Sequence, residues 1–134
     1  MRYLLDTNVV SDLVRNPEGR ITQRIREVGE AQVCTNIIVA AEVRFGMAKR
    51  GSQRLSRQAG TVLKSLQILS IEAPVDITYA DLRASLEASG QPIGANDLLI
   101  ASHAVTLGLT LVTDNVREFG RVDGLQVENW FRDD

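Results

Sequence analysis

Short apolar runs alternate along the chain with longer stretches in which apolar residues recur at helical spacing. The apolar runs predict strands at residues 2–5, 32–35, 68–71, 109–113 and 125–128. The helical spacing, with Gly, Ser and Pro at its breaks, predicts helices from the first strand to residue 14, then at 18–28, 36–49, 53–66, 76–88 and 95–107. Strands that alternate with helices favour an α/β fold, in which a short central parallel sheet has helices on both faces.

Length and composition indicate one domain. The 134 residues, 44% apolar and 24% charged, contain no repeat, linker or low-complexity segment, so we expect a single domain over 1–134. No apolar run approaches the roughly 20 residues that span a bilayer, and the amino terminus does not resemble a secretory leader. We therefore expect a cytoplasmic protein. The one cysteine, Cys34, excludes an internal disulfide framework, and we interpret it as a buried strand thiol.

Charge is unevenly distributed along the chain. The net charge of −2, taken alone, argues against a nucleic-acid-binding protein. However, no Asp or Glu occurs from Val43 to Ile71, and this stretch contains Arg44, Lys49, Arg50, Arg54, Arg57 and Lys64. Arginine outnumbers lysine thirteen to two in the whole chain, and its planar guanidinium suits phosphate contacts. The stretch is therefore either a solvated helical face or a surface that holds phosphates.

Acidic residues occur at the ends of expected strands and within apolar helices. Asp6 follows the first strand, and Asp114 follows the run LTLV. Glu42 stands among apolar residues in NIIVAAEV, and Asp97 lies in the first turn of NDLLIASHA, both without a cation at helical spacing. Each acid has an ordinary explanation by itself: a helix cap for Asp6, a turn for Asp114, a distant ion pair for Glu42 and a complement to the helix dipole for Asp97.

Taken together, these acids favour a metal site. The carboxyl ends of parallel strands share one edge of a sheet, where ligands commonly bind. Clustered carboxylates repel one another unless a cation lies among them, and oxygen ligands without a set of His or Cys point to Mg²⁺ or Mn²⁺. Such a site can activate water to hydrolyse a phosphodiester. We therefore predict that Asp6 is exposed at this edge and holds a metal ion.

The ordered motifs make a family recognisable. LLDTNVVSDLV, IIVAAEVRFGMAK, IGANDLLIASHA, LVTDNVREF and VDGLQVENW resemble a PIN-domain ribonuclease, and more closely a VapC-type toxin of a bacterial type II toxin–antitoxin system. The resemblance implies that Asp6, Glu42 and Asp97 are the core metal-binding and catalytic acids. The family's fourth acid belongs in the VTDN segment, where its usual position aligns with Asn115 and Asp114 lies one residue earlier; we add Asp114 to the metal-binding and catalytic set. Residues implied to orient ligands or water are Thr7, Asn8, Thr113 and Asn115.

The resemblance also implies an activity and its partners. Family members of this kind are endoribonucleases dependent on Mg²⁺ or Mn²⁺, usually homodimers, and are silenced by a VapB-type antitoxin. The leading expectation for the substrate is the anticodon stem-loop of initiator tRNA. Operator DNA would be contacted only through the antitoxin. RNA beside an acidic pocket needs nearby cations, and the candidates are Arg44, Lys49, Arg50, Arg54 and Arg57.

Three other functions compete with this interpretation. A ribonuclease that uses a histidine pair needs two titrating groups, whereas His103 is the only histidine and lies on an apolar helix that favours packing or a dimer surface. A haloacid dehalogenase-type phosphatase would show DxDxT, but Asn8 stands at the second acid. A non-catalytic PIN scaffold that binds RNA or protein stays open because Asn115 replaces an acid. Trp130 and Phe131 are expected to cover the core, with base stacking as an alternative.

Overall fold

The computed structural model describes residues 1–132, and within them a parallel sheet of five strands runs in the order β3-β2-β1-β4-β5. The strands are short and span β1 Tyr3–Leu5, β2 Val33–Asn36, β3 Gln67–Leu69, β4 Thr110–Val112 and β5 Val127–Glu128. β1 pairs with β2 on one side and β4 on the other, with Leu5 opposite Val112. Residues that follow β1, β2 and β4 therefore lie side by side at one edge of the sheet.

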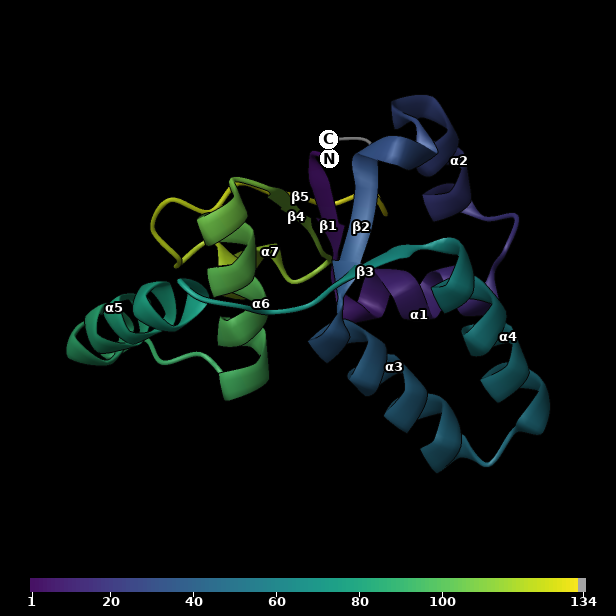
Figure 1. Cartoon of the computed structure of the whole chain (residues 1–134), viewed down its shortest axis with the longest axis horizontal. Coiled ribbons are helices and arrows are strands. Elements are labelled where there is room, and N and C mark those ends of the chain that lie inside the picture. The colour runs from purple at the N-terminus through teal and green to yellow at the C-terminus, as the bar shows by residue number, and fades with distance from the viewer. Residues whose placement is uncertain (133–134) are drawn as a thin grey trace.

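Helices connect these strands. Seven α-helices occur in residues 1–132, namely α1 Thr7–Arg15, α2 Arg20–Val28, α3 Ile37–Arg50, α4 Gln53–Ser65, α5 Val75–Ala88, α6 Ala95–Leu107 and α7 Val116–Phe119, with a 3₁₀ turn η1 at Glu30–Gln32. Figure 1 shows α1, α2 and α4 on one side of the strands and α5 and α6 on the other. The α/β class, the parallel sheet and the helices on both faces are thus as predicted. None of the helices in residues 1–132 has the length and apolar character to cross a bilayer.

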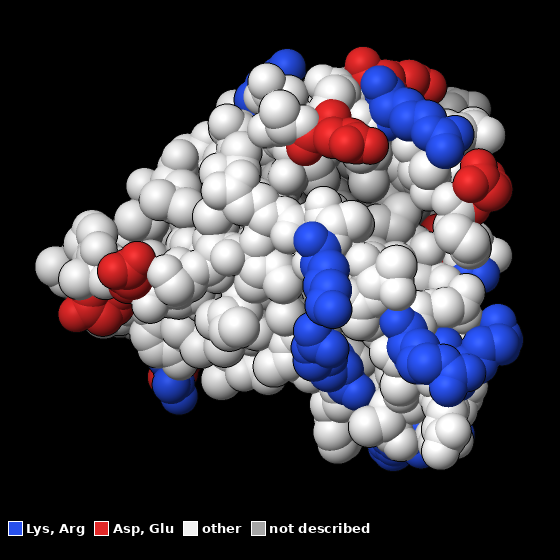
Figure 2. Space-filling model, turned by 45° about the vertical axis from the view of Figure 1, so that its right-hand side comes forward, with Lys and Arg blue, Asp and Glu red and all other residues white. Residues whose placement is uncertain are grey.

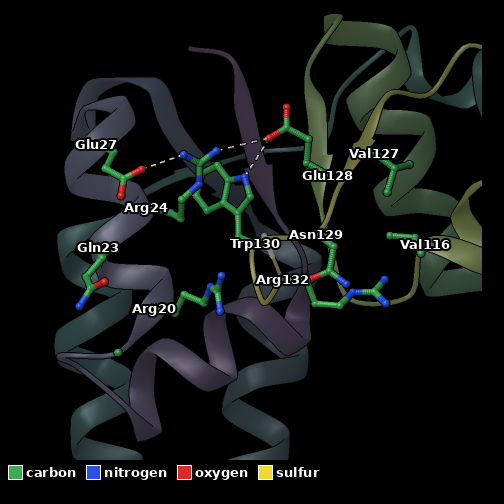
Figure 3. A pocket seen from close by; sticks show the side chains of 11 residues that line it. Arg20, Gln23, Arg24, Glu27, Val116, Val127, Glu128, Asn129, Trp130 and Arg132 are labelled. Atoms are coloured by element: carbon green, nitrogen blue, oxygen red, sulfur yellow. Dashed lines mark hydrogen bonds and ion pairs between the residues drawn. The ribbon is translucent and has the colours of Figure 1, made fainter. Parts of the chain in front are cut away.

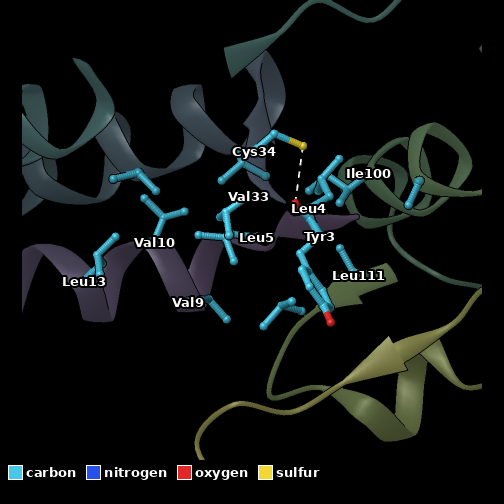
Figure 4. Close-up of a cluster of buried hydrophobic side chains, with 14 of the residues drawn as sticks. Tyr3, Leu4, Leu5, Val9, Val10, Leu13, Val33, Cys34, Ile100 and Leu111 are labelled. Carbon is cyan, nitrogen blue, oxygen red and sulfur yellow. Dashed lines mark hydrogen bonds between the residues drawn. The ribbon is translucent and has the colours of Figure 1, made fainter. Parts of the chain in front are cut away.

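The core lies where the helices meet the central strands. Leu4 and Leu5 of β1 are fully buried, and α1 presents Val9, Val10 and Leu13 to the same core at the spacing of one helical face (Figure 4). The thiol of Cys34 is buried and donates to the Tyr3 carbonyl over 3.4 Å. Burial raises the pKa of this thiol to about 11, so Cys34 is a structural residue, as predicted.

The tail closes the core on the α2 side, as expected for Trp130. Its ring meets the Tyr3 ring edge-on, with centroids 5.1 Å apart, and only 2% of the residue is exposed. The Trp130 indole N–H donates to Glu128 Oε1 over 3.0 Å. An indole buried this fully cannot stack on a base directly, so the structure supports the covering role.

Two local predictions need correction. The segment VREF forms the helix α7, which the pattern did not predict because four residues are too few to show a helical period. Asp6 stands at the N-cap position of α1, but its side chain makes no capping hydrogen bond. A capping role occurs instead one strand away, where Asn36 Oδ1 accepts from the Val39 amide over 2.9 Å at the start of α3.

Candidate functional site

Asp6 lies where β1 ends. Its charge and those of Glu42, Asp97, Asp114 and Glu118 act on one another here, and we call this part of the sheet the acidic edge. Asp6 is not exposed as predicted: only 4% of the residue is accessible, because α1 begins at the next residue and β4 runs alongside. Its Oδ2 accepts from the Thr113 hydroxyl over 2.7 Å. Its Oδ1 is the one buried side-chain oxygen or nitrogen in residues 1–132 that has no hydrogen-bond partner. Burial raises the pKa of Asp6, and the charges of Glu42 and Asp114 raise it further.

Glu42 reaches the same edge from the second turn of α3. The Thr7 hydroxyl donates to its Oε1 over 2.6 Å, and Asn96 Nδ2 donates more weakly to Oε2 over 3.4 Å. Within the described residues Glu42 forms no ion pair, so the distant salt bridge that would explain its place on an apolar helix is not made. Its carboxylate is therefore held by neutral donors, Thr7 and Asn96.

Asp97 completes the group from the first turn of α6. Burial is the largest cause that raises its pKa to about 6, and the charges of Asp6, Glu118 and Glu42 contribute next. A hydrogen bond with the Glu118 carboxyl raises the pKa further. The dipole of α6 would lower the pKa of an acid at this position, so the rise indicates that burial and neighbouring negative charge dominate.

The VTDN segment places its two candidate residues differently. Asp114 is exposed and accepts from Asn8 Nδ2 over 2.8 Å, on the outer side of the edge. The backbone N–H of Asn115 donates to the Thr113 hydroxyl over 3.0 Å, and its side-chain amide donates to Glu118 Oε2 over 2.7 Å. Asn115 thus holds the acid that lies beside Asp97, whereas Asp114 acts on Asp6 through its charge.

Glu118 is a site residue that the sequence analysis missed. It lies on α7 and contacts Asp97, although 21 positions separate the two in the chain. The available signal was the spacing of Asn115 and Glu118, three residues apart, which places both on one face if VREF is helical. A single acid in a short polar segment gives no such indication without that helix.

The donor atoms gathered at this edge are of the kind that binds a divalent cation. As the side chains stand, no three His, Cys, Asp or Glu groups in residues 1–132 are close enough together to enclose one ion. Neighbouring acids are close enough to raise the pKa of Asp6 and of Asp97, and Asp6 Oδ1 is buried without a donor. Carboxylates with no cation among them repel, so they are expected to remain apart. The available donors are all oxygens, as Mg²⁺ and Mn²⁺ prefer.

The predicted RNA-binding cations lie on α3 and α4. Arg44 is exposed two residues after Glu42, and Lys49 and Arg50 form the exposed last turn of α3. Arg54 and Arg57 are exposed on α4. Figure 2 shows basic side chains gathered over the lower part of the molecule, where these two helices lie in Figure 1. Their role in RNA binding stays a prediction.

His103 is a packing residue, which is one of the two roles predicted for it. It is 2% exposed, and its Nδ1 lies 3.0 Å from Asn36 Nδ2. Because that amide nitrogen only donates, the ring nitrogen accepts and the imidazole is neutral. Burial lowers the pKa of His103, which agrees with the neutral form.

Known proteins resemble this chain over nearly its whole length. The family model for the PIN domain matches residues 3–125. A protein named ribonuclease VapC2 from Rickettsia felis is 36% identical over 132 residues, which are 97% of this chain and 98% of the relative. A protein named tRNA(fMet)-specific endonuclease VapC from Shigella flexneri is 30% identical over 133 residues, with the same coverage.

Solved structures agree with the sequence relatives. The chain superimposes with a TM-score of 0.86 and 31% identity on a chain of DNA-bound VapBC from Salmonella typhimurium, covering 97% of this chain and 98% of that one. For VapBC2 from Rickettsia felis, bound to a DNA fragment of its promoter, the TM-score is 0.84 and the identity 34%, covering 97% and 99%. The fold, the matched family model and these identities lead to one conclusion: the chain belongs to the PIN-domain family, among its VapC ribonucleases.

Proposed function

We propose that this protein is a metal-dependent endoribonuclease and the toxin of a VapBC-type toxin–antitoxin module. The observation that carries the proposal is the Asp6 carboxyl, which is buried, is held by Thr113 on one oxygen and leaves the other oxygen without a partner among like charges. A structural carboxylate would have both oxygens satisfied, because an unsatisfied buried acceptor costs roughly 1–3 kcal/mol. A bound cation removes that cost.

The acids would fall into two groups with different tasks. Asp6, Glu42 and Asp97 would hold the metal ion, with Thr113 and Thr7 fixing the first two by the hydrogen bonds described above. Asp114, steadied by Asn8, and Glu118, steadied by Asn115, add negative charge around that group. PIN-domain nucleases generally use a divalent metal, and the oxygen donors here suit Mg²⁺ or Mn²⁺. When bound, such an ion activates water and stabilises the charge of a phosphodiester under attack.

The basic residues of α3 and α4 would hold RNA beside this acidic edge. Arg44, Lys49, Arg50, Arg54 and Arg57 are the candidates, and their exposure is consistent with contacts to phosphates. Reversing Arg50 and Arg54 to Glu should weaken RNA binding at low salt while metal affinity, measured by Mn²⁺ titration, stays within about twofold. RNA affinity that is unchanged at low salt would refute this part.

The names of relatives support a specific substrate and partner. The Shigella relative is named for tRNA(fMet), so initiator tRNA, cut in its anticodon stem-loop, is the substrate we propose. The similar structures are VapBC complexes, some of them with DNA, which supports a VapB-type antitoxin that blocks the site and contacts operator DNA. We further propose a homodimer, a single domain over 1–134 and a cytoplasmic location. A non-catalytic PIN scaffold that binds RNA or protein partners is the alternative.

One experiment tests the proposal. RNA ends are sequenced after a brief pulse of expression in a bacterium, with Asp6→Ala as the matched inactive variant. We expect growth arrest and new ends confined to one RNA class with the wild-type chain, and neither with the variant. Cuts in another RNA would keep the nuclease and refute the tRNA target. Harmless expression without new ends would favour the scaffold.

A further inference from the structure

Gly46 lies in the interior of α3, where glycine is the least favourable residue after proline because it loses the most backbone freedom on folding. A fold needs a glycine where φ is positive or where another segment comes too close for a Cβ. Neither condition holds at Gly46. It is not among the glycines with positive φ, and a Cβ built on it would meet nothing within 4 Å except its chain neighbours and the backbone of its own helix. Neither backbone conformation nor packing therefore requires this glycine.

Gly46 stands on the flank of α3 that carries Glu42. Residues three and four apart share one side of a helix, and Glu42, Gly46 and Lys49 follow one another at intervals of four and three. At 1.5 Å per residue, Gly46 lies about 6 Å along the helix axis from Glu42, and Lys49 lies about 10 Å from it. Lys49 is exposed and forms no ion pair within residues 1–132. The partly exposed glycine thus lies between an acid of the acidic edge and an unpaired cation.

The basic surface on the other side of the acidic edge is already engaged. It is a groove of about 980 Å³ between α2, the start of α7 and the chain after β5 (Figure 3). Within it Arg24 Nη1 lies 2.9 Å from Glu27 Oε2, and Arg24 Nη2 lies 3.9 Å from Glu128 Oε1. Arg20 and Arg132, which also line the groove, have partners as well. A phosphate chain that leaves the acidic edge therefore meets a free cation on α3 rather than in this groove.

We propose that Gly46 is a substrate-positioning residue, and that RNA with a phosphate at the acidic edge runs over it to Lys49. The missing side chain leaves room for the RNA backbone against the helix. This inference rests on the proposed ribonuclease function and names the path of the substrate across α3. A side chain at position 46 would stand between the strand and the helix and move the phosphate away from the acids, and a misplacement of about 1 Å can lower the rate about 10²-fold.

A second copy of this chain is the competing occupant of the space beside Gly46. Helices of two copies could approach closely at a glycine. Such a contact would enclose Glu42 and Lys49, and burying charged groups is costly unless each one finds a partner. RNA instead supplies a phosphate to Lys49 and leaves Glu42 to the metal ion. The free cation on this flank therefore favours RNA.

The test uses substitutions that should change stability and function in opposite directions. Gly46→Ala and Gly46→Gln introduce good helix formers into open space, so the melting temperature should rise by about 3 °C. Gly60→Ala and Gly60→Gln are the matched controls. Gly60 is likewise inside a helix, has no positive φ and leaves a Cβ without a contact within 4 Å, but its helix α4 contains no acidic residue. They should raise the melting temperature equally.

RNA binding and cleavage are measured on the same four variants. Binding is followed by anisotropy of fluorescein-labelled bulk bacterial tRNA, with Ca²⁺ in place of Mg²⁺ to slow cleavage. Cleavage of total bacterial RNA is followed under single-turnover conditions with Mg²⁺. Gly46→Ala should weaken binding about threefold and slow cleavage about tenfold, and Gly46→Gln should slow cleavage about 10²-fold. Both Gly60 variants should stay within about twofold of wild type. Mn²⁺ affinity should be unchanged in all four, because no group that holds the metal is altered.

The outcomes separate this inference from the function on which it rests. Gly46 variants that bind and cleave RNA within twofold of wild type overturn it even if the protein is a nuclease. A lowered melting temperature would assign Gly46 to the packing of the fold and overturn it as well. Loss of a dimer in light scattering, with RNA binding unchanged, would assign this flank to a second copy and overturn it. Weakened binding in a chain that cleaves no RNA supports the path over Gly46 and refutes the nuclease, and a wild-type chain that binds no RNA refutes both.

Discussion

Two buried polar sites stand at the ends of the neighbouring strands β1 and β2, and the fold treats them in opposite ways. At the end of β2, Asn36 uses both ends of its amide: its Oδ1 caps α3 and its Nδ2 donates to His103. At the end of β1, Asp6 has one oxygen bound to Thr113 and the other without a partner in residues 1–132. Both residues are almost completely buried.

The Asn36 site stabilises the fold, whereas the Asp6 site is left without electrostatic compensation. The Asn36–His103 pair joins α3 to α6, and a neutral imidazole with its lowered pKa accepts the bond without burying a charge. α3 and α6 carry Glu42 and Asp97, so the satisfied pair fixes the two helices that the acidic edge depends on. At the edge itself, burial and like charge are left uncompensated. The open oxygen of Asp6 is what the metal-binding role proposed above requires.

The largest expected effect is a loss of activity when one acid of the acidic edge is neutralised. Asp97→Asn should lower the rate of RNA cleavage with Mg²⁺ by about 10²-fold or more, because a charged ligand is lost, and should not lower the melting temperature. Single-turnover cleavage and thermal melting measure the two quantities. Asp123→Asn, an exposed acid before Gly124, is the matched control and should cleave as wild type. An Asp97→Asn protein that cleaves at near wild-type rate would contradict the assignment.

A substitution in the Asn36–His103 pair should instead lower the stability of the fold. Asn36→Ala removes the cap of α3 and leaves His103 without its donor, so the free energy of unfolding should fall by about 2–3 kcal/mol in urea denaturation. Ser52→Ala is the comparison, since Ser52 caps α4 by accepting from the Leu55 amide over 3.2 Å nearer the surface. It should cost about 1 kcal/mol or less. Equal losses in the two variants would mean that the His103 bond adds nothing.

The acidic half of this contrast was visible in the sequence. Asp6, Glu42 and Asp97 stood out because each lacked a local partner, and the structure brings all three within electrostatic reach. The alternation of apolar runs and helical stretches was sufficient for the fold, since burial in a parallel sheet leaves a strong pattern. Local pattern could not decide how far Asp6 is buried, because the cover comes from β4 and Thr113, more than 100 positions away.

The remaining parts depend on contacts that a single sequence does not encode locally. Glu118 looks like one more surface acid until α7 turns it toward Asp97. Arg24 looks like a helix-surface residue until the tail brings Trp130 beneath it. His103 could have been a surface residue of a dimer, and only the position of Asn36 makes it an acceptor in the core. In each case the decisive partner comes from another element.

A smaller effect is expected from the hydrogen bond between the Thr113 hydroxyl and the Asp6 carboxyl. Thr113→Val keeps the shape of the side chain and removes the donor to Asp6 Oδ2, so Mn²⁺ affinity measured by calorimetry should fall about tenfold. Thr110→Val is the control, because the Thr110 hydroxyl only reaches Gln126 over 3.4 Å at the surface. Unchanged affinity in Thr113→Val would show that Asp6 needs no second residue to orient it.

The smallest expected effect is on the pH dependence of stability. The folded-state pKa of Asp97 is about 6, above its ordinary value of 3.8, so its proton stabilises the fold at low pH and that stability is lost as pH rises through 6. Without metal, the melting temperature of the wild type should therefore fall between pH 4.5 and 7.5 relative to Asp97→Asn. The difference should be roughly 2–4 °C, since Asp97 is only half-buried. Mg²⁺ should reverse it at pH 7.5 and have little effect at pH 4.5, because only the charged carboxylate attracts the ion. Identical pH profiles of the two proteins would show that like charge does not strain the acidic edge.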